Sequence, residues 1–567
     1  MHTTPSSGPH GPSIGPSAAS AARGTLTAAC VAALVGCAQP GAAPPAADAA
    51  SAEAACRELP QRATLASTLL STRYHAAGTR HAGNKPDGVK LPGHCVVTGS
   101  IDPRTGVDGK PYATGFELSL PDGWNGRLLY LGGGGNDGVL RDTSQSSSIS
   151  GATPSPLSQG WAVVSTDAGH RGQSGTFALD PRARVDHAFD AHHKTALAAR
   201  ALIAQRYGRL PHHAYFSGCS GGGRQGMMFS QRYPELFDGI TAGAPAMRVS
   251  SGATVAAMWN TLKFSAVAPQ DAAGRPIVSR AFSDADLQLL AQGINQACDA
   301  ADGVVDGLVQ HTAACRFDPA VLQCSGAKTE RCLSSAQVGA LRDVFGGPRD
   351  SAGRALYFGQ PWDPGVAGPG WRQWTLGKST TGQPDSRYVF LMVDALKHEF
   401  ITPPDPGFDY TKFDFDRDPA RMSWFSALYD TYEDTQLAAF RRRGGKLLFI
   451  HGMSDPIFSA TETIDYYTKL AARNGGVDAT QSFARAYLVP GMNHCSGGPA
   501  TDGFDSIQAM VDWVERGVAP DRIPARAAPN NAWFPNRTRP LCPYPAYARY
   551  KGSGSIEDAA SFDCVRP

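Results

Sequence analysis

The sequence of 567 residues has little net charge, no long apolar run and no internal repeat. Its 52 Lys and Arg nearly balance its 50 Asp and Glu, and a formal charge of +2 gives no reason to expect nucleic acid or an acidic partner. The apolar run 25-TLTAACVAALVG-36 is far below the roughly 20 residues that span a bilayer. The absence of a repeat excludes solenoids and propellers.

The short apolar run instead predicts an export signal. It ends in 34-LVGC-37, which resembles a bacterial lipobox, so we expect a signal peptide over 1–37 with Cys37 lipidated and a disordered Ala- and Pro-rich tether over 38–55. The alternative is an ordinary cleavage site with an incidental cysteine, because Arg23 is the only basic residue before the run. Either alternative predicts an exported protein, in the periplasm, on the outer membrane or secreted. A lipid on Cys37, which only the lipobox reading gives, would be its one contact with a membrane.

The 12 cysteines lack the CxxC spacing of metal sites. So many cysteines in this arrangement are typical of an oxidising compartment, in which disulfides form.

Apolar, β-rich runs alternate with helical patterns, which predicts an α/β fold. The expected strands are 127–131, 161–166, 214–218, 238–245, 446–452 and 485–491. The expected helices include 194–208 and 504–517. Residues 247–433 break this rhythm and are rich in Gly, Pro and aromatics. We therefore predict an α/β-hydrolase core in two parts, 56–246 and 434–567, with a large inserted lid domain between them.

The stretch 215-YFSGCSGGGRQGMM-228 places Ser220 in a Gly-x-Ser-x-Gly setting between an expected strand and an expected helix. An α/β-hydrolase nucleophile needs such a turn, with small neighbours that let the backbone bend. The alternative is a glycine-rich loop with an inert serine.

A base and a carboxylate should follow the nucleophile in the order Ser, Asp, His, each after a core strand. Asp455 in 451-HGMSDP-456 and His494 in 490-PGMNHC-495 fit this order. Either residue alone would be more simply read as an ordinary turn or polar side chain. The oxyanion donors should be the N–H of Gly221 and the loop 132-GGGG-135, with Gly135 as the second donor.

Cys219 precedes the expected nucleophile, and Cys495 follows the expected base. If Ser220 and His494 meet, these two cysteines come close enough for a disulfide. The alternative is a free Cys219 that acts as the nucleophile.

Five motifs resemble the tannase and feruloyl esterase family of serine esterases over nearly the whole mature chain: 218–245, 298-CDAADGVVDGLV-309, 451-HGMSDP-456, 490-PGMNHCSGG-498 and 539–554. The resemblance implies a triad of Ser220, Asp455 and His494 and a Cys219–Cys495 disulfide. Together with proximity it also implies four further pairs: Cys56 with Cys95, Cys298 with Cys315, Cys324 with Cys332, and Cys542 with Cys564.

Asp299, Asp302 and Asp306 crowd three carboxylates into one glycine-containing loop, and an oxygen-only set favours Ca²⁺. A solvated turn is the alternative. The resemblance implies a structural Ca²⁺ with these three side chains and the carbonyls of Val304 and Leu308 as ligands.

Within the family, the chain most resembles the branch that hydrolyses mono(2-hydroxyethyl) terephthalate. The resemblance implies that Arg387 holds the free carboxylate. It implies that Phe458, Trp374 and Phe400 contact the aromatic ring. Leu391 stands where that branch has a phenylalanine, Gly221 replaces an acidic residue, and Gly134 replaces a serine.

The sequence thus predicts a monomeric serine carboxylesterase for small aromatic esters, with the terephthalate half-ester favoured. Feruloyl, chlorogenate or galloyl esters are the alternative substrates. A lipid-anchored binding protein on a hydrolase scaffold is the alternative from a different class of function.

Overall fold

In the computed structural model, the described residues are 49–85, 88–146, 149–150 and 154–567. The predicted signal peptide, the lipobox with Cys37 and the tether as far as residue 48 lie outside them. Among the described residues, no helix combines the length and the apolarity that crossing a membrane requires.

A mixed sheet of nine strands, counted over the described residues, runs in the order β1-β2-β3-β5-β4-β6-β7-β8-β9. The strands are β1 (Thr68–His75), β2 (His94–Thr105), β3 (Pro111–Pro121), β4 (Arg127–Leu131), β5 (Ala162–Thr166), β6 (His213–Cys219), β7 (Gly239–Gly243), β8 (Lys446–Gly452) and β9 (Ala484–Val489). β1, β2, β3 and β5 pair antiparallel in succession, and the strands from β5 to β9 pair in parallel. This mixed α/β architecture is the predicted one.

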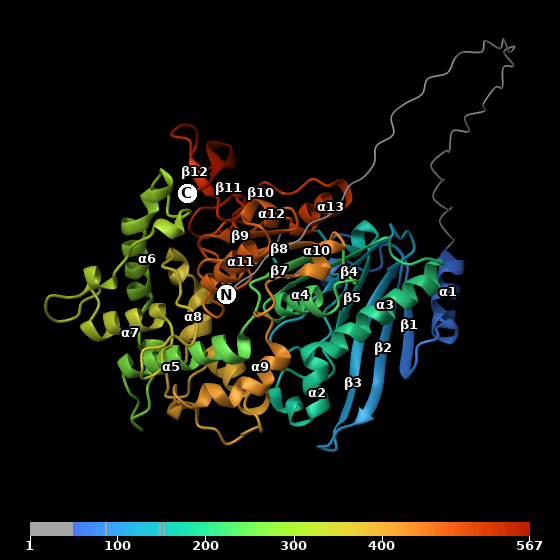
Figure 1. Ribbon diagram of the computed structural model, residues 1–567, viewed down its shortest axis with the longest axis horizontal. Coiled ribbons are helices and arrows are strands. Elements are labelled where there is room, and N and C mark those ends of the chain that lie inside the picture. Colours follow the sequence, from blue (N-terminus) through green and yellow to red (C-terminus); the bar gives the residue numbers. More distant parts are fainter. Residues whose placement is uncertain (1–48, 86–87, 147–148, 151–153) are drawn as a thin grey trace, which may run out of the picture. The chain divides into compact units, whose positions relative to one another are not determined.

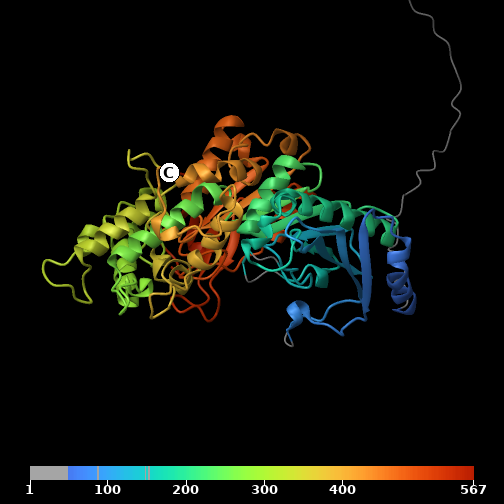
Figure 2. The same ribbon diagram turned by 90° about the horizontal axis from the view of Figure 1, so that it is seen from below.

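Helices cover both faces of the parallel strands (Figures 1 and 2). The helices are α1 (Ala49–Arg62), α2 (Pro181–Val185), α3 (Ala191–Tyr207), α4 (Gly221–Arg232), α5 (Thr254–Val267), α6 (Asp284–Cys298), α7 (Ser335–Gly346), α8 (Pro369–Thr375), α9 (Ser423–Tyr429), α10 (Ala438–Arg442), α11 (Ala460–Arg473), α12 (Val477–Gln481) and α13 (Ser506–Arg516). Two short hairpins follow: β10 (Ile523–Arg526) with β11 (Thr538–Leu541), and β12 (Tyr547–Tyr550) with β13 (Phe562–Val565).

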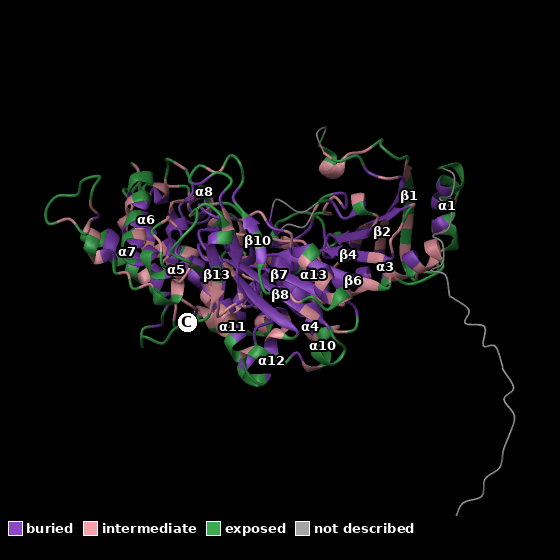
Figure 3. Ribbon diagram, turned by 90° about the horizontal axis from the view of Figure 1, so that it is seen from above, coloured by how far each residue is buried: buried purple, intermediate pink, exposed green. Residues whose placement is uncertain are grey.

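The central strands are buried on both faces, which explains their continuous apolar sequences (Figure 3). Alternate residues of β4 enter different cores: Leu128 and Tyr130 pack with α3 and α4, whereas Leu129 and Leu131 pack with α13. The sheet is thus held between two hydrophobic layers, and the carboxyl ends of its parallel strands are free to carry a site.

The chain between β7 and β8, residues 244–445, contributes no strand to the sheet in this fully described stretch. We call it the insertion. Its helices α5 to α8 lie on the opposite side of the parallel strands from β1, β2 and β3 (Figures 1 and 2). It has one apolar cluster of its own, around Phe264, and a second, around Phe425, that it shares with Ala188 and Phe458 of the core.

The predicted tether ends earlier than residue 55, because α1 begins at Ala49. Alanine favours helix, Ala52 and Leu59 are buried against the core, and a disulfide joins Cys56 to Cys95. Composition alone indicated disorder here, whereas tertiary contacts stabilise a helix.

Candidate active site

Ser220 occupies a strained turn between β6 and α4, with φ 68° and ψ −126°. Non-glycine residues rarely adopt this conformation unless the surroundings impose it. Here the Ser220 N–H donates to the Gly243 carbonyl at 3.0 Å, and the Ser220 carbonyl accepts from the Arg224 N–H at 3.0 Å. The backbone bonds therefore fix the turn at the carboxyl end of β6.

The glycines around Ser220 are required because two backbones touch there. A Cβ atom on Gly218 would lie 2.9 Å from the Cα of Gly132, and one on Gly222 would lie 2.9 Å from the carbonyl oxygen of Gly133. The predicted glycine loop, 132–135, consequently lies directly against the Ser220 turn.

Two buried polar side chains hold this glycine loop. The Gly133 N–H donates to Gln225 Oε1 at 3.0 Å, and the Gly134 N–H donates to Asp137 Oδ1 at 3.0 Å. The next N–H, of Gly135, and the N–H of Gly221 donate to no other group among the described residues. These are the two donors predicted for an oxyanion.

His494 and Asp455 form a close pair. His494 Nδ1 lies 2.7 Å from Asp455 Oδ2, so the tautomer with its proton on Nδ1 donates to this carboxylate and leaves Nε2 able to accept a proton. The other oxygen, Asp455 Oδ1, accepts from the N–H groups of Ile457 and Phe458 at 2.9 and 3.1 Å. One carboxylate oxygen therefore contacts the histidine, while the other holds Asp455 in place through its own loop.

Asp455 is buried, and burial alone would raise the pKa of its carboxyl group. The charge of His494 and the hydrogen bonds from His451 and His494 outweigh burial and hold this pKa well below its ordinary value. Asp455 is therefore a permanent anion in the folded protein at neutral pH.

Aromatic rings from two segments pack against the His494 ring. The ring centroids of Trp374 in the insertion and Phe458 in the core lie 5.1 and 5.4 Å from that of His494, both in edge-on geometry. The guanidinium of Arg387 lies over Trp374, 5.2 Å from its ring. Three of the predicted substrate-contacting residues are thus gathered around His494.

A cavity of about 380 Å³ opens at this place. Its lining residues are Gly134, Gly135, Arg141, Gln173, Cys219, Ser220, Trp374, Arg387, Phe390, Leu391, His494 and Cys495. Phe400 and Phe458, both predicted as ring contacts, do not line it. Both side chains are buried in one apolar cluster, in which Phe400 stacks on Phe425.

The insertion also fastens the loops that carry the pair. The carboxylate of Asp363 accepts from Ser454 Oγ and from the Gly491 N–H at 2.5 and 3.1 Å. The side chain of Asn493 donates to the Gly365 carbonyl at 2.9 Å. One segment of the insertion therefore contacts the immediate neighbours of both Asp455 and His494.

Each of the five predicted cysteine pairs forms a disulfide. The Cys219–Cys495 bond joins positions 276 residues apart, with a Cα–Cα distance of 6.0 Å. Cys219 is therefore no free nucleophile. It ties the Ser220 turn to the His494 loop.

The predicted calcium loop contains buried carboxylates. Burial raises the pKa of Asp299 to about 6 and that of Asp302 to about 7, and the charge of Asp306 adds to both shifts. Asp299 Oδ1 is buried and has no hydrogen-bond partner, which fits a cation ligand. Asp306 pairs with Arg539, and the described residues contain no group of three acidic, His or Cys side chains already gathered as a metal cluster.

Several residues of the site carried no signal in the sequence. Gln225 and Asp137 look like ordinary polar residues until the loop they hold is seen. Phe390 is 68% exposed and lines the cavity beside Leu391, so it supplies a phenyl ring next to the position where the sequence lacked one.

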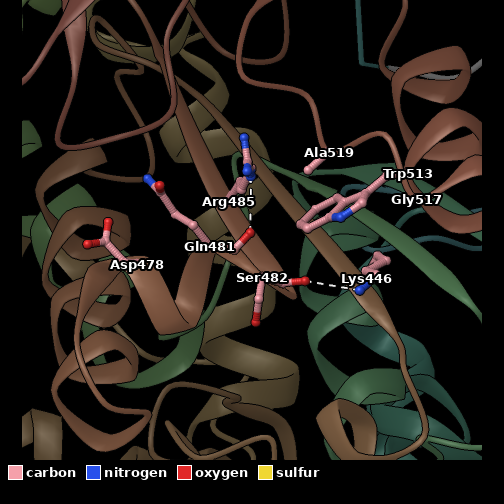
Figure 4. Close-up of a pocket in the computed structure, with 8 residues that line it drawn as sticks. All are labelled: Lys446, Asp478, Gln481, Ser482, Arg485, Trp513, Gly517 and Ala519. Atoms are coloured by element: carbon pink, nitrogen blue, oxygen red, sulfur yellow. Dashed lines mark hydrogen bonds between the residues drawn. The ribbon is translucent and has the colours of Figure 1, made fainter.

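A second hollow lies away from this site, where the indole of Trp513 stands between Lys446 and Arg485 (Figure 4). Arg485 pairs with Asp521, and Lys446 donates to the Ser482 carbonyl. No residue of the serine cavity lines this hollow.

The sheet order and the strained serine turn at the end of a parallel strand define an α/β-hydrolase fold. The model of the family described as tannase and feruloyl esterase matches residues 95–565, so the chain belongs to the tannase and feruloyl esterase family.

Two relatives agree with this assignment, and one solved structure shares the fold. The chain is 44% identical over 526 residues to mono(2-hydroxyethyl) terephthalate hydrolase of Piscinibacter sakaiensis, covering 84% of this chain and 85% of that protein. It is 30% identical over 473 residues to a probable feruloyl esterase of Arthroderma benhamiae, covering 79% and 82%. The crystal structure of feruloyl esterase B from Aspergillus oryzae matches with a TM-score of 0.74 at 24% identity, over 90% of this chain and all of that one.

Proposed function

We propose that the chain is a serine esterase that hydrolyses small aromatic esters, with mono(2-hydroxyethyl) terephthalate as its favoured substrate. One observation carries the proposal. Ser220, His494 and Arg387 line a single cavity, and His494 is paired with a buried carboxylate at 2.7 Å. This arrangement combines the groups that acyl transfer needs with a cation for the substrate's free carboxylate.

In the proposed reaction, Ser220 Oγ attacks the ester carbonyl carbon while His494 Nε2 accepts the hydroxyl proton. The oxyanion accepts hydrogen bonds from the N–H groups of Gly221 and Gly135. The tetrahedral species collapses, ethylene glycol leaves with the proton from His494, and an acyl-enzyme remains. Water, deprotonated by His494, then releases terephthalate and restores Ser220. Asp455 keeps the histidine oriented and stabilises its positive charge.

The substrate preference is argued from the insertion. Arg387 is exposed and forms no ion pair with the carboxylates of the described residues, so its planar guanidinium is available for a bidentate bond to a ligand. Trp374 and Phe390 offer flat apolar surface for a benzene ring. The name of the relative that is 44% identical supports the same substrate.

Feruloyl or galloyl esters are the second candidate class, favoured by the family and by the probable feruloyl esterase at 30% identity. The test compares kcat/KM for mono(2-hydroxyethyl) terephthalate, methyl ferulate and methyl gallate, with Ser220→Ala as the blank. We expect preference for the half-ester, and a loss of at least tenfold for it alone in Arg387→Ala. Preference for ferulate or gallate would refute the role of Arg387 and leave the esterase standing.

A non-catalytic binding protein is tested separately. A fluorophosphonate probe should label the wild-type chain at Ser220 and should not label Ser220→Ala. An unlabelled wild-type chain without turnover of any of the three esters would refute the esterase itself.

We also propose a structural Ca²⁺, export and a monomeric state. The calcium ligands would be the side chains of Asp299, Asp302 and Asp306 with the carbonyls of Val304 and Leu308. Five disulfides support folding in an oxidising compartment. All groups named in the reaction come from one chain.

A further inference from the structure

The cavity around Ser220 contains two guanidinium groups. Arg387 comes from the insertion, and Arg141 comes from the loop after β4. No Asp or Glu stands among the described residues that line this cavity. A cavity with two cations and no lining carboxylate is suited to a ligand with more than one negative charge.

Arg141 lies beside the glycine loop. Its Nη2 donates to the Gly133 carbonyl at 3.0 Å, and a Cβ atom on Gly134 would lie 3.3 Å from the same nitrogen. A side chain at position 134 would therefore press on the guanidinium. The glycine found there leaves room for Arg141 next to Gly135, the proposed oxyanion donor.

Arg141 has no carboxylate partner within ion-pair distance among the described residues. Asp137 lies behind the loop within electrostatic reach, but its two oxygens accept from the Gly134 N–H and from Gln225. Among the described residues, the Arg141 guanidinium, which has five N–H groups, donates one hydrogen bond, to the Gly133 carbonyl. The remaining donors are available to a ligand.

We propose that Arg141 is a second anion-binding residue of this cavity, and that Arg141 and Arg387 together bind an aromatic dicarboxylate. This inference rests on the proposed function. Hydrolysis of a half-ester turns the carbonyl at the glycine loop into a new carboxylate, close to Arg141, while the distal carboxylate stays at Arg387. The dianionic product therefore binds more tightly than a monoanion of the same shape, and it inhibits turnover.

The test varies one charge on the ligand and one on the protein. Terephthalate is compared with 4-carbamoylbenzoate, which has nearly the same shape and one negative charge fewer, by calorimetry and by inhibition of hydrolysis. We expect terephthalate to bind at least tenfold more tightly to the wild-type chain. In Arg141→Gln the ratio of the affinities for terephthalate and 4-carbamoylbenzoate falls below about threefold. Arg141→Lys keeps the positive charge but not the planar guanidinium, so it retains part of this ratio.

Arg171→Gln is the matched control, because Arg171 is exposed and does not line this cavity. It removes the same charge nearby and should leave the ratio unchanged. Thermal unfolding of each variant checks that it is folded. If Arg141→Gln does not fold, Arg141→Lys takes its place in the comparison.

An equal affinity of the two ligands for the wild-type chain would overturn the inference. So would an unchanged ratio in Arg141→Gln, or an equal fall in Arg171→Gln. These outcomes differ from a failure of the proposed function, which is read from turnover of the three esters and not from binding.

Discussion

Gln225 and Asp137 are hydrogen-bonded to each other at 2.8 Å and join the helix after Ser220 to the glycine loop. Gln225 lies on α4, and each of the two side chains accepts from one N–H of the loop. The donor at Gly135 is thus oriented through its two preceding residues. One small buried polar network thus joins the helix that follows Ser220, the proposed nucleophile, to the loop of the proposed oxyanion donor Gly135.

We predict that Gln225→Leu lowers kcat by about 10- to 100-fold with less than about threefold change in KM, because a misaligned oxyanion donor weakens transition-state binding. Steady-state kinetics on the half-ester measures this. Gln231→Leu is the control on the same helix, since Gln231 donates to the Thr431 carbonyl away from the loop. Equal losses in both variants would mean that helix stability, and not the loop, was affected.

Removing the Cys219–Cys495 disulfide should cost more stability than removing Cys324–Cys332. The two bonds close loops of 276 and 8 residues, for which chain entropy gives about 5.6 and about 2.5 kcal/mol. Urea unfolding of the two double Cys→Ser variants measures the difference. Of the two double variants, only the one that lacks the Cys219–Cys495 bond should also have a lower kcat. Full activity in it would contradict a positioning role for the bond.

Glu462 should make the folded protein less stable as pH rises. It lies on α11, and burial raises the pKa of its carboxyl to about 8 in the fold, whereas an unfolded glutamate has a pKa near 4.5. Between these values the unfolded chain releases a proton that the folded chain keeps, so the free energy of unfolding falls as pH rises.

The test is Glu462→Gln, which cannot ionise and can still accept from Tyr357, the partner of Glu462 at 2.9 Å. The Tm of the variant minus the Tm of the wild-type chain should be larger at pH 8 than at pH 5. A difference in Tm that does not change with pH would refute the assignment.

Calcium removal should lower Tm. Ca²⁺ bound only to the folded state stabilises it by mass action, so chelation with EDTA should lower Tm and added Ca²⁺ should restore it, with little effect of Mg²⁺. Asp302→Asn should blunt this response. A chain that holds no Ca²⁺ by elemental analysis and keeps its Tm in EDTA would refute the site.

Parts of the fold were predictable because buried parallel strands leave continuous apolar runs: the ranges 127–131 and 446–452 match β4 and β8 residue for residue. β1, β2 and β3 were missed, since polar or proline residues such as Ser71, Arg73 and Pro103 interrupt their apolar residues and because each strand pairs with an antiparallel neighbour. The alternation of apolar and polar residues alone did not distinguish these strands from loops.

The order of Ser220, Asp455 and His494 was also readable, because each follows a core strand. Gln225 and Arg141 were not, since a polar side chain acquires its role only from what the fold brings beside it. Phe400 shows the opposite error. A sequence cannot tell an aromatic ring that faces a cavity from one that packs in a core.

The bond between Cys219 and Cys495 has a consequence for timing. A newly made chain in a compartment that keeps thiols reduced would hold its serine and its histidine on loops that no covalent link joins. Its catalytic competence would then begin only where sulfur is oxidised.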